Sequence, residues 1–295
     1  MRTNKFLHSI SIITVIVSLL LTSIAWGKPH KKRLGKKPPT KEAVTETVQD
    51  EEKDAEFQSL IADLNSADPE KVVFAIQMLG ATGNPAACGH LIKLLKTGPG
   101  TDITNLALQT LGVLGNPDAV DTLLSYLNHR RSDARLAALL ALEGFSSEKI
   151  RHSLEQKLRD SDPQVRASAA FSLAEKGDAS SVPILFKAFD RGVNEAAIAI
   201  GRLGSANDAI KLTDYLGKID ISVLLPGFKE FLLGTRIDEN VKLKVLNILF
   251  DFAGPEVRQF AVEMNAKIKA AHPDMEYDDP ILKLLSKMIN QIVQD

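Results

Sequence analysis

Apolar residues recur along this chain at the spacing of a helix face, and residues 162–189 show the pattern clearly. Asp162 and Pro163 are typical of a helix start, because the carboxylate can accept hydrogen bonds from free backbone amides and proline has no amide to satisfy. The helix that follows carries one apolar face, made of Val165, Ala169, Ala170 and Leu173. Gly177 supplies the backbone freedom to end this helix, and a second apolar helix follows it. The unit predicts a helix, a tight turn and a second helix.

From Asp68 onward the same unit recurs with a period of about 31 residues. The first helices share an anchor position, occupied by Leu79, Leu111, Leu142, Leu173 and Ile200, with steps of 32, 31, 31 and 27 residues. The turns share a second position, occupied by Gly83, Gly115, Ser146, Gly177 and Gly204. The second helices share a third, occupied by Leu91, Leu123, Leu154, Leu185 and Leu212. These three columns predict a tandem array of helix pairs, with a compressed linker at residues 190–192.

These residues resemble HEAT repeats of the short phycobilisome-lyase-like type, whose pattern is Asp-Pro, Val-Arg, Ala-Ala, Leu and then Gly-Asp or Gly-Asn. The turns at residues 83–85 and 115–117 match that pattern. The resemblance covers residues 57–217 well and residues 218–295 loosely. It implies an all-α fold, a right-handed α-solenoid (armadillo/HEAT-like) of about five helix pairs, with degenerate repeats and a helical cap over residues 218–295. Within that last part, we expect Pro226 and Gly227 to break or kink a helix.

The resemblance also implies a mode of action, since most members of such families bind other proteins and a minority act in bilin attachment. In such arrays the second helices usually line the concave side. Their outward positions form two rows, which are the candidate partner-binding residues. The rows are Lys93, Ser125, Gln156, Lys187 and Asp214, and Lys96, Asn128, Arg159 and Asp190. The alternative is that these are ordinary solvated surface residues.

Residues 1–27 have the pattern of an export signal. Basic residues precede an apolar stretch at residues 6–24, and Ala25 and Gly27 fit a cleavage site. Cleavage would give a periplasmic or cell-surface protein with a formal net charge of −3 instead of −1, because it removes Arg2 and Lys5 and no acid. The alternative is an uncleaved anchor in the inner membrane, since 19 residues can just cross a bilayer. The basic run that follows favours this alternative.

Residues 28–56 are a polar segment that is divided by charge sign. Residues 28–41 contain seven basic residues and no acid, whereas residues 42–56 contain seven acids and one Lys. We expect a disordered charged linker, because such a segment buries too little apolar surface to fold alone. The basic half could also contact an anionic lipid or polymer through salt-screened attraction. It has no aromatic residue for base stacking, so it predicts no specific nucleic-acid binding.

The sequence contains no recognisable catalytic, cofactor or metal motif. Cys88 is the only cysteine, which excludes an intrachain disulfide, and we expect it to be a small buried apolar residue. The acidic run at residues 274–279 lacks the glycine and the terminal Glu of a calcium loop, and its last residue, Asp279, is better explained as a helix cap.

These observations predict a non-catalytic protein-protein interaction scaffold of the bacterial cell envelope, with no cofactor and an unidentified protein partner. Two alternatives remain open. One is an envelope protein that binds anionic lipid or polymer through its basic tether, and the other is an accessory, lyase-like subunit of an enzyme.

The export signal makes a first testable prediction. Amino-terminal sequencing of the protein from its own host should begin at Lys28, because the cleavage site ends at Gly27. A retained Met1, or any start before Ala25, would contradict cleavage and favour the membrane anchor.

Overall fold

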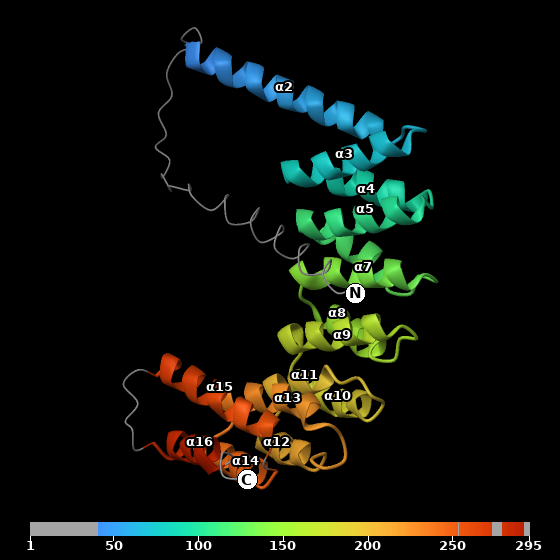
Figure 1. Ribbon diagram of the computed structural model, residues 1–295. Coiled ribbons are helices and arrows are strands. Elements are labelled where there is room, and N and C mark those ends of the chain that lie inside the picture. The colour runs from blue at the N-terminus through green and yellow to red at the C-terminus, as the bar shows by residue number, and fades with distance from the viewer. Residues whose placement is uncertain (1–40, 253, 273–278, 292–295) are drawn as a thin grey trace. The chain divides into compact units, whose positions relative to one another are not determined.

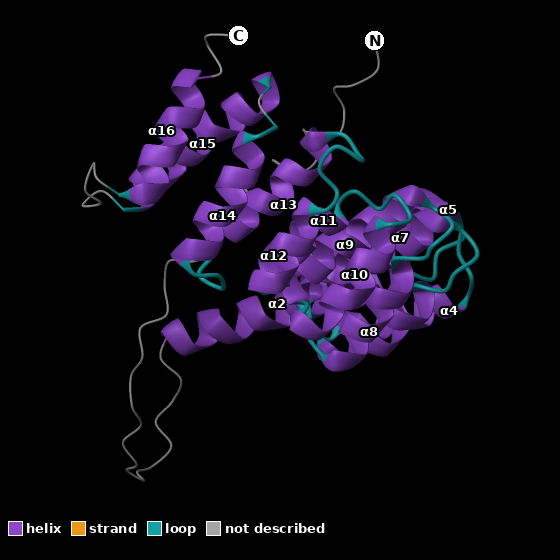
Figure 2. Cartoon of the chain, turned by 90° about the horizontal axis from the view of Figure 1, so that it is seen from below, coloured by secondary structure: helices purple, strands orange, loops and turns teal. Residues whose placement is uncertain are grey.

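The computed structural model describes residues 41–252, 254–272 and 279–291, and these residues form helices joined by loops (Figure 2). No residue in these ranges belongs to a β-strand, and no helix in them is long and apolar enough to span a membrane. The predicted signal, the alternative anchor and the basic tether up to residue 40 lie outside the described residues. The chain divides into two compact units, residues 1–51 and 52–295.

Helix α2 (Lys41–Asp63) comes first, and the helices after it alternate as first and second members of successive pairs (Figure 1). The first helices are α3 (Pro69–Thr82), α5 (Thr101–Leu114), α7 (Ser132–Ala141), α9 (Pro163–Lys176), α11 (Ala196–Leu203), α13 (Ile221–Leu233) and α15 (Pro255–Ala271). The second helices are α4 (Ala87–Lys96), α6 (Val120–Tyr126), α8 (Glu148–Lys157), α10 (Val182–Phe189), α12 (Ala206–Thr213), α14 (Glu239–Phe250) and α16 (Pro280–Gln291). Three short 3-10 turns are η1 (Pro117–Ala119), η2 (Leu142–Gly144) and η3 (Ala179–Ser181).

The two leucine-rich columns form the continuous core of this array. Every anchor residue of the first and second helices has at most 1% of its surface exposed. Burying a leucine or isoleucine side chain stabilises the fold by about 1.5–3 kcal/mol, so the columns supply a large part of the driving force. The all-α solenoid predicted from the sequence is confirmed.

The first helices pack closely on one another because small residues lie where they meet. A Cβ atom added to Gly112 of α5 would lie 2.7 Å from the Cα atom of Ala141 in α7. A Cβ atom on Gly201 of α11 would lie 2.1 Å from the carbonyl oxygen of Gly227 in α13. From α4 to α10, the second helix instead packs on the first helix of the next pair, as α8 does on α9 and α10 on α11, whereas α12 and α14 pack on the following second helices, α14 and α16. The pairs from α3 to α12 are therefore closest along their first helices.

The predicted helix ends are confirmed, although one glycine acts for a different reason. Asp162 accepts hydrogen bonds from the amides of Gln164 and Val165, at 2.8 and 3.4 Å, and caps α9. Gly83 follows α3 in the left-handed conformation, with a φ angle of 62°, which favours glycine. Gly177 has a φ angle of −74°, and a side chain is excluded there because its Cβ atom would lie 2.5 Å from the Leu173 carbonyl oxygen.

The fifth unit is shorter than the others in its first helix, and not in the linker before it as the sequence predicted. The linker between α10 and α11, residues 190–195, is not compressed. Instead α11 has 8 residues, whereas α9 has 14. Ala197 and Ile200 of this shortened helix are completely buried, and the helix packs against both α9 and α13.

Two other segments differ from the sequence-based expectation. Helix α2 includes residues 41–56, which were assigned to the disordered linker, so helical structure does not begin only at residue 57. Glu, Ala, Lys and Gln residues in this segment are strong helix formers. Leu60, in the last turn of α2, and Leu64, directly after it, are buried. Pro226 lies inside α13, and the helix is not interrupted there.

The close packing of the first helices predicts opposite effects for two glycine substitutions. Gly112→Ala should destabilise the fold by about 1–3 kcal/mol, because the new methyl group collides with the backbone of α7. Gly89→Ala is the matched control, because Gly89 lies in α4 with open space around it, and it should stabilise by about 0.5–1 kcal/mol. Urea unfolding followed by circular dichroism measures both, and equal effects would contradict the close approach.

Candidate functional site

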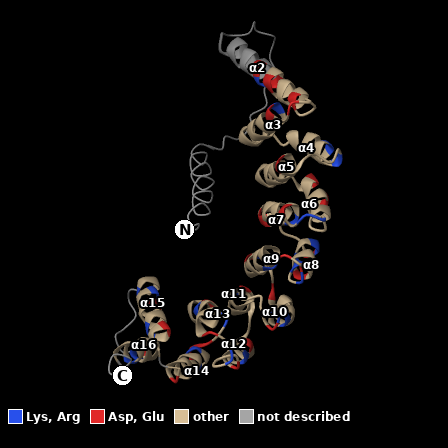
Figure 3. Ribbon diagram, turned by 45° about the vertical axis from the view of Figure 1, so that its right-hand side comes forward, with Lys and Arg blue, Asp and Glu red and all other residues tan. Residues whose placement is uncertain are grey.

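The predicted partner-binding residues lie on the second helices or directly after them. All nine are exposed, namely Lys93, Lys96, Ser125, Asn128, Gln156, Arg159, Lys187, Asp190 and Asp214. Within residues 52–295, Figure 3 shows the first helices on the inner side of the curved array and the second helices on its outer side, so the expectation that these rows line the concave side is wrong. Their exposure is a structural fact, and their binding role stays a prediction.

Some members of these rows have structural partners and others have none. Asn128 accepts a hydrogen bond from the Lys157 ammonium at 3.0 Å, and Asp190 accepts one from the Tyr215 hydroxyl at 2.6 Å. The four cations of these rows are Lys93, Lys96, Arg159 and Lys187. Among the described residues, their charged groups form no hydrogen bond or ion pair.

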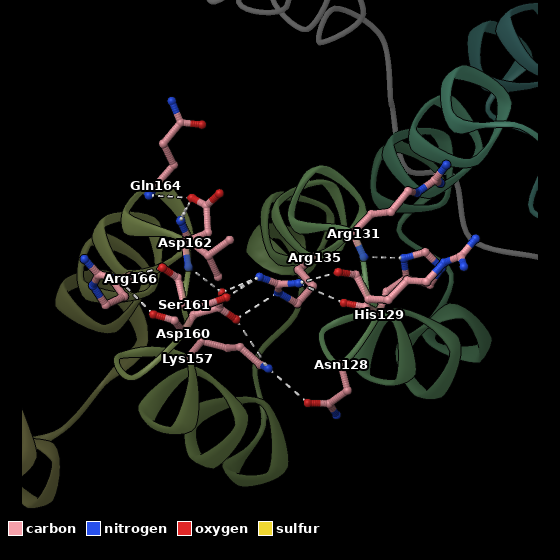
Figure 4. A network of polar contacts seen from close by, with 12 residues as sticks. Asn128, His129, Arg131, Arg135, Lys157, Asp160, Ser161, Asp162, Gln164 and Arg166 are labelled. Atoms are coloured by element: carbon pink, nitrogen blue, oxygen red, sulfur yellow. Dashed lines mark hydrogen bonds and ion pairs between the residues drawn. The ribbon is translucent and has the colours of Figure 1, made fainter.

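A buried ion pair holds the linkers beside these rows in place (Figure 4). Arg135 of α7 donates to both carboxylate oxygens of Asp160, at 2.9 and 2.6 Å. It also donates to the carbonyl oxygens of His129 and Arg130, at 2.9 and 3.2 Å. The side chains of Arg135 and Asp160 are only 10% and 5% exposed. The pair thus fixes the linker after α8 against the linker after α6.

Hydrogen bonding keeps Asp160 ionised in this position. Burial alone would raise the pKa of its carboxyl group, but hydrogen bonds from the Arg135 guanidinium and the Asp162 amide outweigh burial, and the pKa is lowered. Because the folded-state pKa lies below the unfolded value, the pair stabilises the fold above about pH 4. This contribution is lost as the pH falls through the folded-state pKa.

A different kind of surface lies on the first helices. Large exposed apolar side chains of the described residues are found on first helices or in loops, and none is on a second helix. Those on first helices are Phe74, Val113, Leu140, Phe171, Leu233 and Val262. Leu140 and Phe171 occupy the equivalent position on α7 and α9, and the half-buried Ile198 occupies it on α11.

A groove of about 550 Å³ lies beside this stripe, between α9, α11 and α13. Phe171 and Ile198 provide its apolar wall, and Ser172 and Ala174 provide small residues at its base. Its charged residues are Glu143, Glu175, Lys176, Arg202 and Glu230. A smaller hollow of about 280 Å³ continues from Arg202 and Glu230 toward Gly234 and Arg236.

The basic groups of the groove are already held by the protein. Lys176 donates to the carbonyl oxygens of Leu142 and Phe145, at 3.0 and 2.7 Å, and also to that of Glu143. Arg202 donates to Glu230 at 2.9 Å and pairs with Glu175. The contacts of Arg202 join α9, α11 and α13, and those of Lys176 join α9 to the segment after α7.

The carboxylate of Glu143 is the acid of the groove that is not bound in this way. Desolvation raises its pKa, and the Lys176 charge opposes that shift. Desolvation also lowers the pKa of Lys176. With three carboxylates against two engaged cations, the groove offers negative charge to a ligand.

This groove was not predicted from the sequence, because the candidate partner-binding residues were those of the second helices. A signal was present in the column two residues before the first-helix anchor. That column holds Gln77 and Gln109 in the first two units and then Leu140, Phe171 and Ile198. A change from polar to apolar residues at an exposed position is the pattern of a binding surface.

The remaining expectations concern single residues. Cys88 is buried and not disulfide-bonded, as expected, and desolvation raises the pKa of its thiol. Asp279 caps α16 by accepting from the amides of Ile281 and Leu282, at 2.9 and 3.0 Å, which confirms that expectation. Residues 273–278 lie outside the described residues. Within the described part, no three His, Cys, Asp or Glu side chains are grouped as metal ligands would be.

The sequence of this chain matches the model of a known protein family. The family model of HEAT repeats matches residues 57–143 and 151–223, which is more than half of the chain. This chain therefore belongs to the HEAT-repeat proteins. A comparison with curated protein sequences returns no significant match.

Solved structures with similar folds include other helical-repeat proteins. The complex of CpcE and CpcF of phycocyanin lyase from Nostoc sp. PCC7120 is 17% identical, with a TM-score of 0.43, and the match covers 90% of this chain and 100% of that chain. A designed armadillo repeat protein is 16% identical, with a TM-score of 0.27 and coverages of 79% and 98%. The N-terminal domain of Mot1, in complex with TBP, is 13% identical, with a TM-score of 0.38 and coverages of 98% and 39%.

The buried ion pair predicts a loss of stability that depends on pH. Arg135→Met should destabilise the fold by about 3–5 kcal/mol at pH 7, because it leaves the buried Asp160 carboxylate without its main partner. The difference from the unsubstituted protein should shrink below about pH 4, where Asp160 becomes protonated.

The matched control is Lys149→Met, which removes the exposed ion pair with Asp121 and should cost less than about 1 kcal/mol. Urea unfolding at pH 7 and pH 3 measures both variants. Equal losses for the two variants, or a pH-independent loss for Arg135→Met, would be inconsistent with the assigned role.

Proposed function

We propose that this chain is a non-catalytic scaffold of the cell envelope that binds an amphipathic helix of a protein partner in the groove between α9, α11 and α13. The observation that carries the proposal is Phe171, an aromatic side chain that is 48% exposed beside the groove. Apolar anchors that enter or flank a well-formed pocket supply most of the energy of protein interfaces. HEAT-repeat solenoids are usually non-catalytic, which supports the first part of the proposal.

The spacing of the apolar stripe favours a helix as the ligand. Packed helices lie about 8–10 Å apart, so Leu140, Phe171 and Ile198 present apolar contacts at about that interval. Seven residues of an α-helix advance about 10.5 Å and return to the same face. A β-strand returns to the same face at about 6.7 Å and then at about 13 Å, which fits the interval less well.

The charge of the groove favours a basic residue on that helix. Lys176 and Arg202 are engaged within the array, so a partner meets the exposed carboxylate of Glu143, which forms no hydrogen bond or ion pair with the described residues. A Lys or Arg beside the apolar face of the helix would satisfy this carboxylate. Such a rim contact contributes more to orientation and specificity than to affinity.

An envelope location rests on the export pattern of residues 1–27. If that pattern is used, the partner is another exported or membrane-attached protein.

A photo-crosslinking experiment tests the groove. A benzoylphenylalanine placed at position 171 of the full-length chain, produced in its own host, should capture one defined protein after irradiation. Mass spectrometry should locate the adduct on an amphipathic helix of that protein that carries basic residues. A Phe171→Asp variant should lose that partner while its thermal stability changes little, because the side chain is half exposed.

The matched control is a benzoylphenylalanine at Phe74, which is also an exposed aromatic residue of a first helix but lies outside the groove. It should not capture the same protein. Identical adducts at both positions, or adducts on an acidic or non-helical segment, would show that the groove is not the binding site.

A further inference from the structure

Lys and Arg positions recur where the second helices end and the inter-pair linkers begin, as the blue segments of the ribbon in Figure 3 show. We call this set the basic edge, and it consists of Lys93, Lys96, Arg130, Arg159, Lys187 and Arg191. All six residues are exposed. Within the described residues, none of their charged groups forms a hydrogen bond or an ion pair.

The acids near the basic edge are largely engaged elsewhere. Asp160 is bound to Arg135, and Asp162 caps α9. Asp133 accepts a hydrogen bond from Asn105 at 2.9 Å, and Asp190 accepts one from Tyr215. The positive charge of the edge is therefore left for an external ligand.

Helix electrostatics explains only part of this pattern. A cation in the last turn of a helix is stabilised by the partial negative charge of the helix end, which accounts for Lys93, Lys96 and Lys187. Arg130 and Arg191 lie in linkers beyond the helix ends, so this effect does not explain them. Their unpaired guanidinium groups extend the edge from one pair to the next.

The edge lacks the features of a nucleic-acid or membrane site. Its nearest aromatic side chains are packed within the array, since Tyr126 stacks on His129 and its hydroxyl donates to the Leu95 carbonyl oxygen at 3.1 Å. Tyr215 likewise packs on Phe186 and Phe189. No exposed aromatic or large apolar side chain of the described residues lies on α4, α6, α8 or α10, so bases have no stacking surface and a bilayer has no inserting residue.

The arrangement of the cations fits carboxylates carried on an extended chain. Each helix pair presents one or two cations, and successive pairs are separated by about 10 Å or more. In an extended polyproline II conformation, residues three apart lie on the same side at about 9.3 Å. We propose that the basic edge binds an extended acidic polypeptide segment, with carboxylates that meet the cations of successive pairs.

This proposal is independent of the groove on the first helices. It uses different helices, different residues and a ligand of the opposite charge. A chain with Phe171→Asp should bind an acidic segment as the unsubstituted chain does, so failure of one proposal can be told apart from failure of the other.

The test uses poly-L-glutamate as the probe and fluorescence anisotropy as the measurement. The full-length chain should bind the labelled polymer, and binding should weaken as salt rises because exposed charges are screened. The variant Arg159→Glu/Lys187→Glu should raise the dissociation constant about tenfold or more, since it reverses two unpaired cations on adjacent pairs. Its melting temperature should change only slightly, because both residues are exposed and unpaired and the helix-end effect lost at Lys187 is small. Lys93→Glu/Lys96→Glu repeats the test on α4.

The matched control is Lys149→Glu/Lys244→Glu, which makes the same change in net charge on exposed residues outside the edge. It should change the dissociation constant by less than about threefold. Equal weakening by the edge and control variants would overturn the proposal, because binding would then follow net charge alone. Absence of polyglutamate binding, together with edge-dependent binding of polyphosphate or of phosphatidylglycerol vesicles, would also overturn it by assigning the edge to another class of ligand.

Discussion

The close approach of neighbouring first helices is the constraint on which the rest of this array depends. It requires the absence of side chains where α5 meets α7, at Gly112, and where α11 meets α13, at Gly201 and Gly227. Because the backbones meet there, the buried columns of adjacent pairs merge into one core. This close contact leaves little room for large side chains between the first helices. A side chain on their solvent-facing side, such as Phe171, therefore stays exposed and available to a ligand.

Cations have two different surroundings in this array. Where pairs are held together, cations are at least half-buried and have partners, as Arg135 has Asp160 and as Lys176 has three carbonyl groups. Such contacts stabilise mainly by avoiding unpaired buried groups, so they depend on geometry and tolerate little change. Where second helices end, cations such as Arg159 and Lys187 are exposed and unpaired. They add little to stability. The partial negative charge of the helix end accounts for Lys187 in the last turn of α10, but not for Arg159, which lies beyond the end of α8.

The array was predictable from the sequence to the extent that its signals are local or periodic. The anchors at Leu79, Leu111 and Leu142 repeat at fixed steps, so burial followed from spacing alone. The role of Gly177 was not predictable, because exclusion of its side chain arises from contact with Leu203 of the next pair as well as from its own helix. The shortening of α11 was not predictable either, since the step of 27 residues shows that the fifth unit is four residues short but not which element has lost them. The groove was not predictable because its residues come from four helix pairs and no single pair shows it.

The two candidate surfaces respond to different physical variables. Contact with Phe171 and Ile198 would be driven by removal of apolar surface from water, which changes little at moderate ionic strength. Contact with the basic edge would be Coulombic between exposed groups, and at physiological salt its range shrinks to about 8 Å. A partner held by both would gain from linkage, because binding at one surface raises the effective concentration at the other. Raising the salt concentration would then remove only the ionic contribution and leave the groove contact in place. The array can therefore hold one partner through two contacts of different chemistry without either contact being strong.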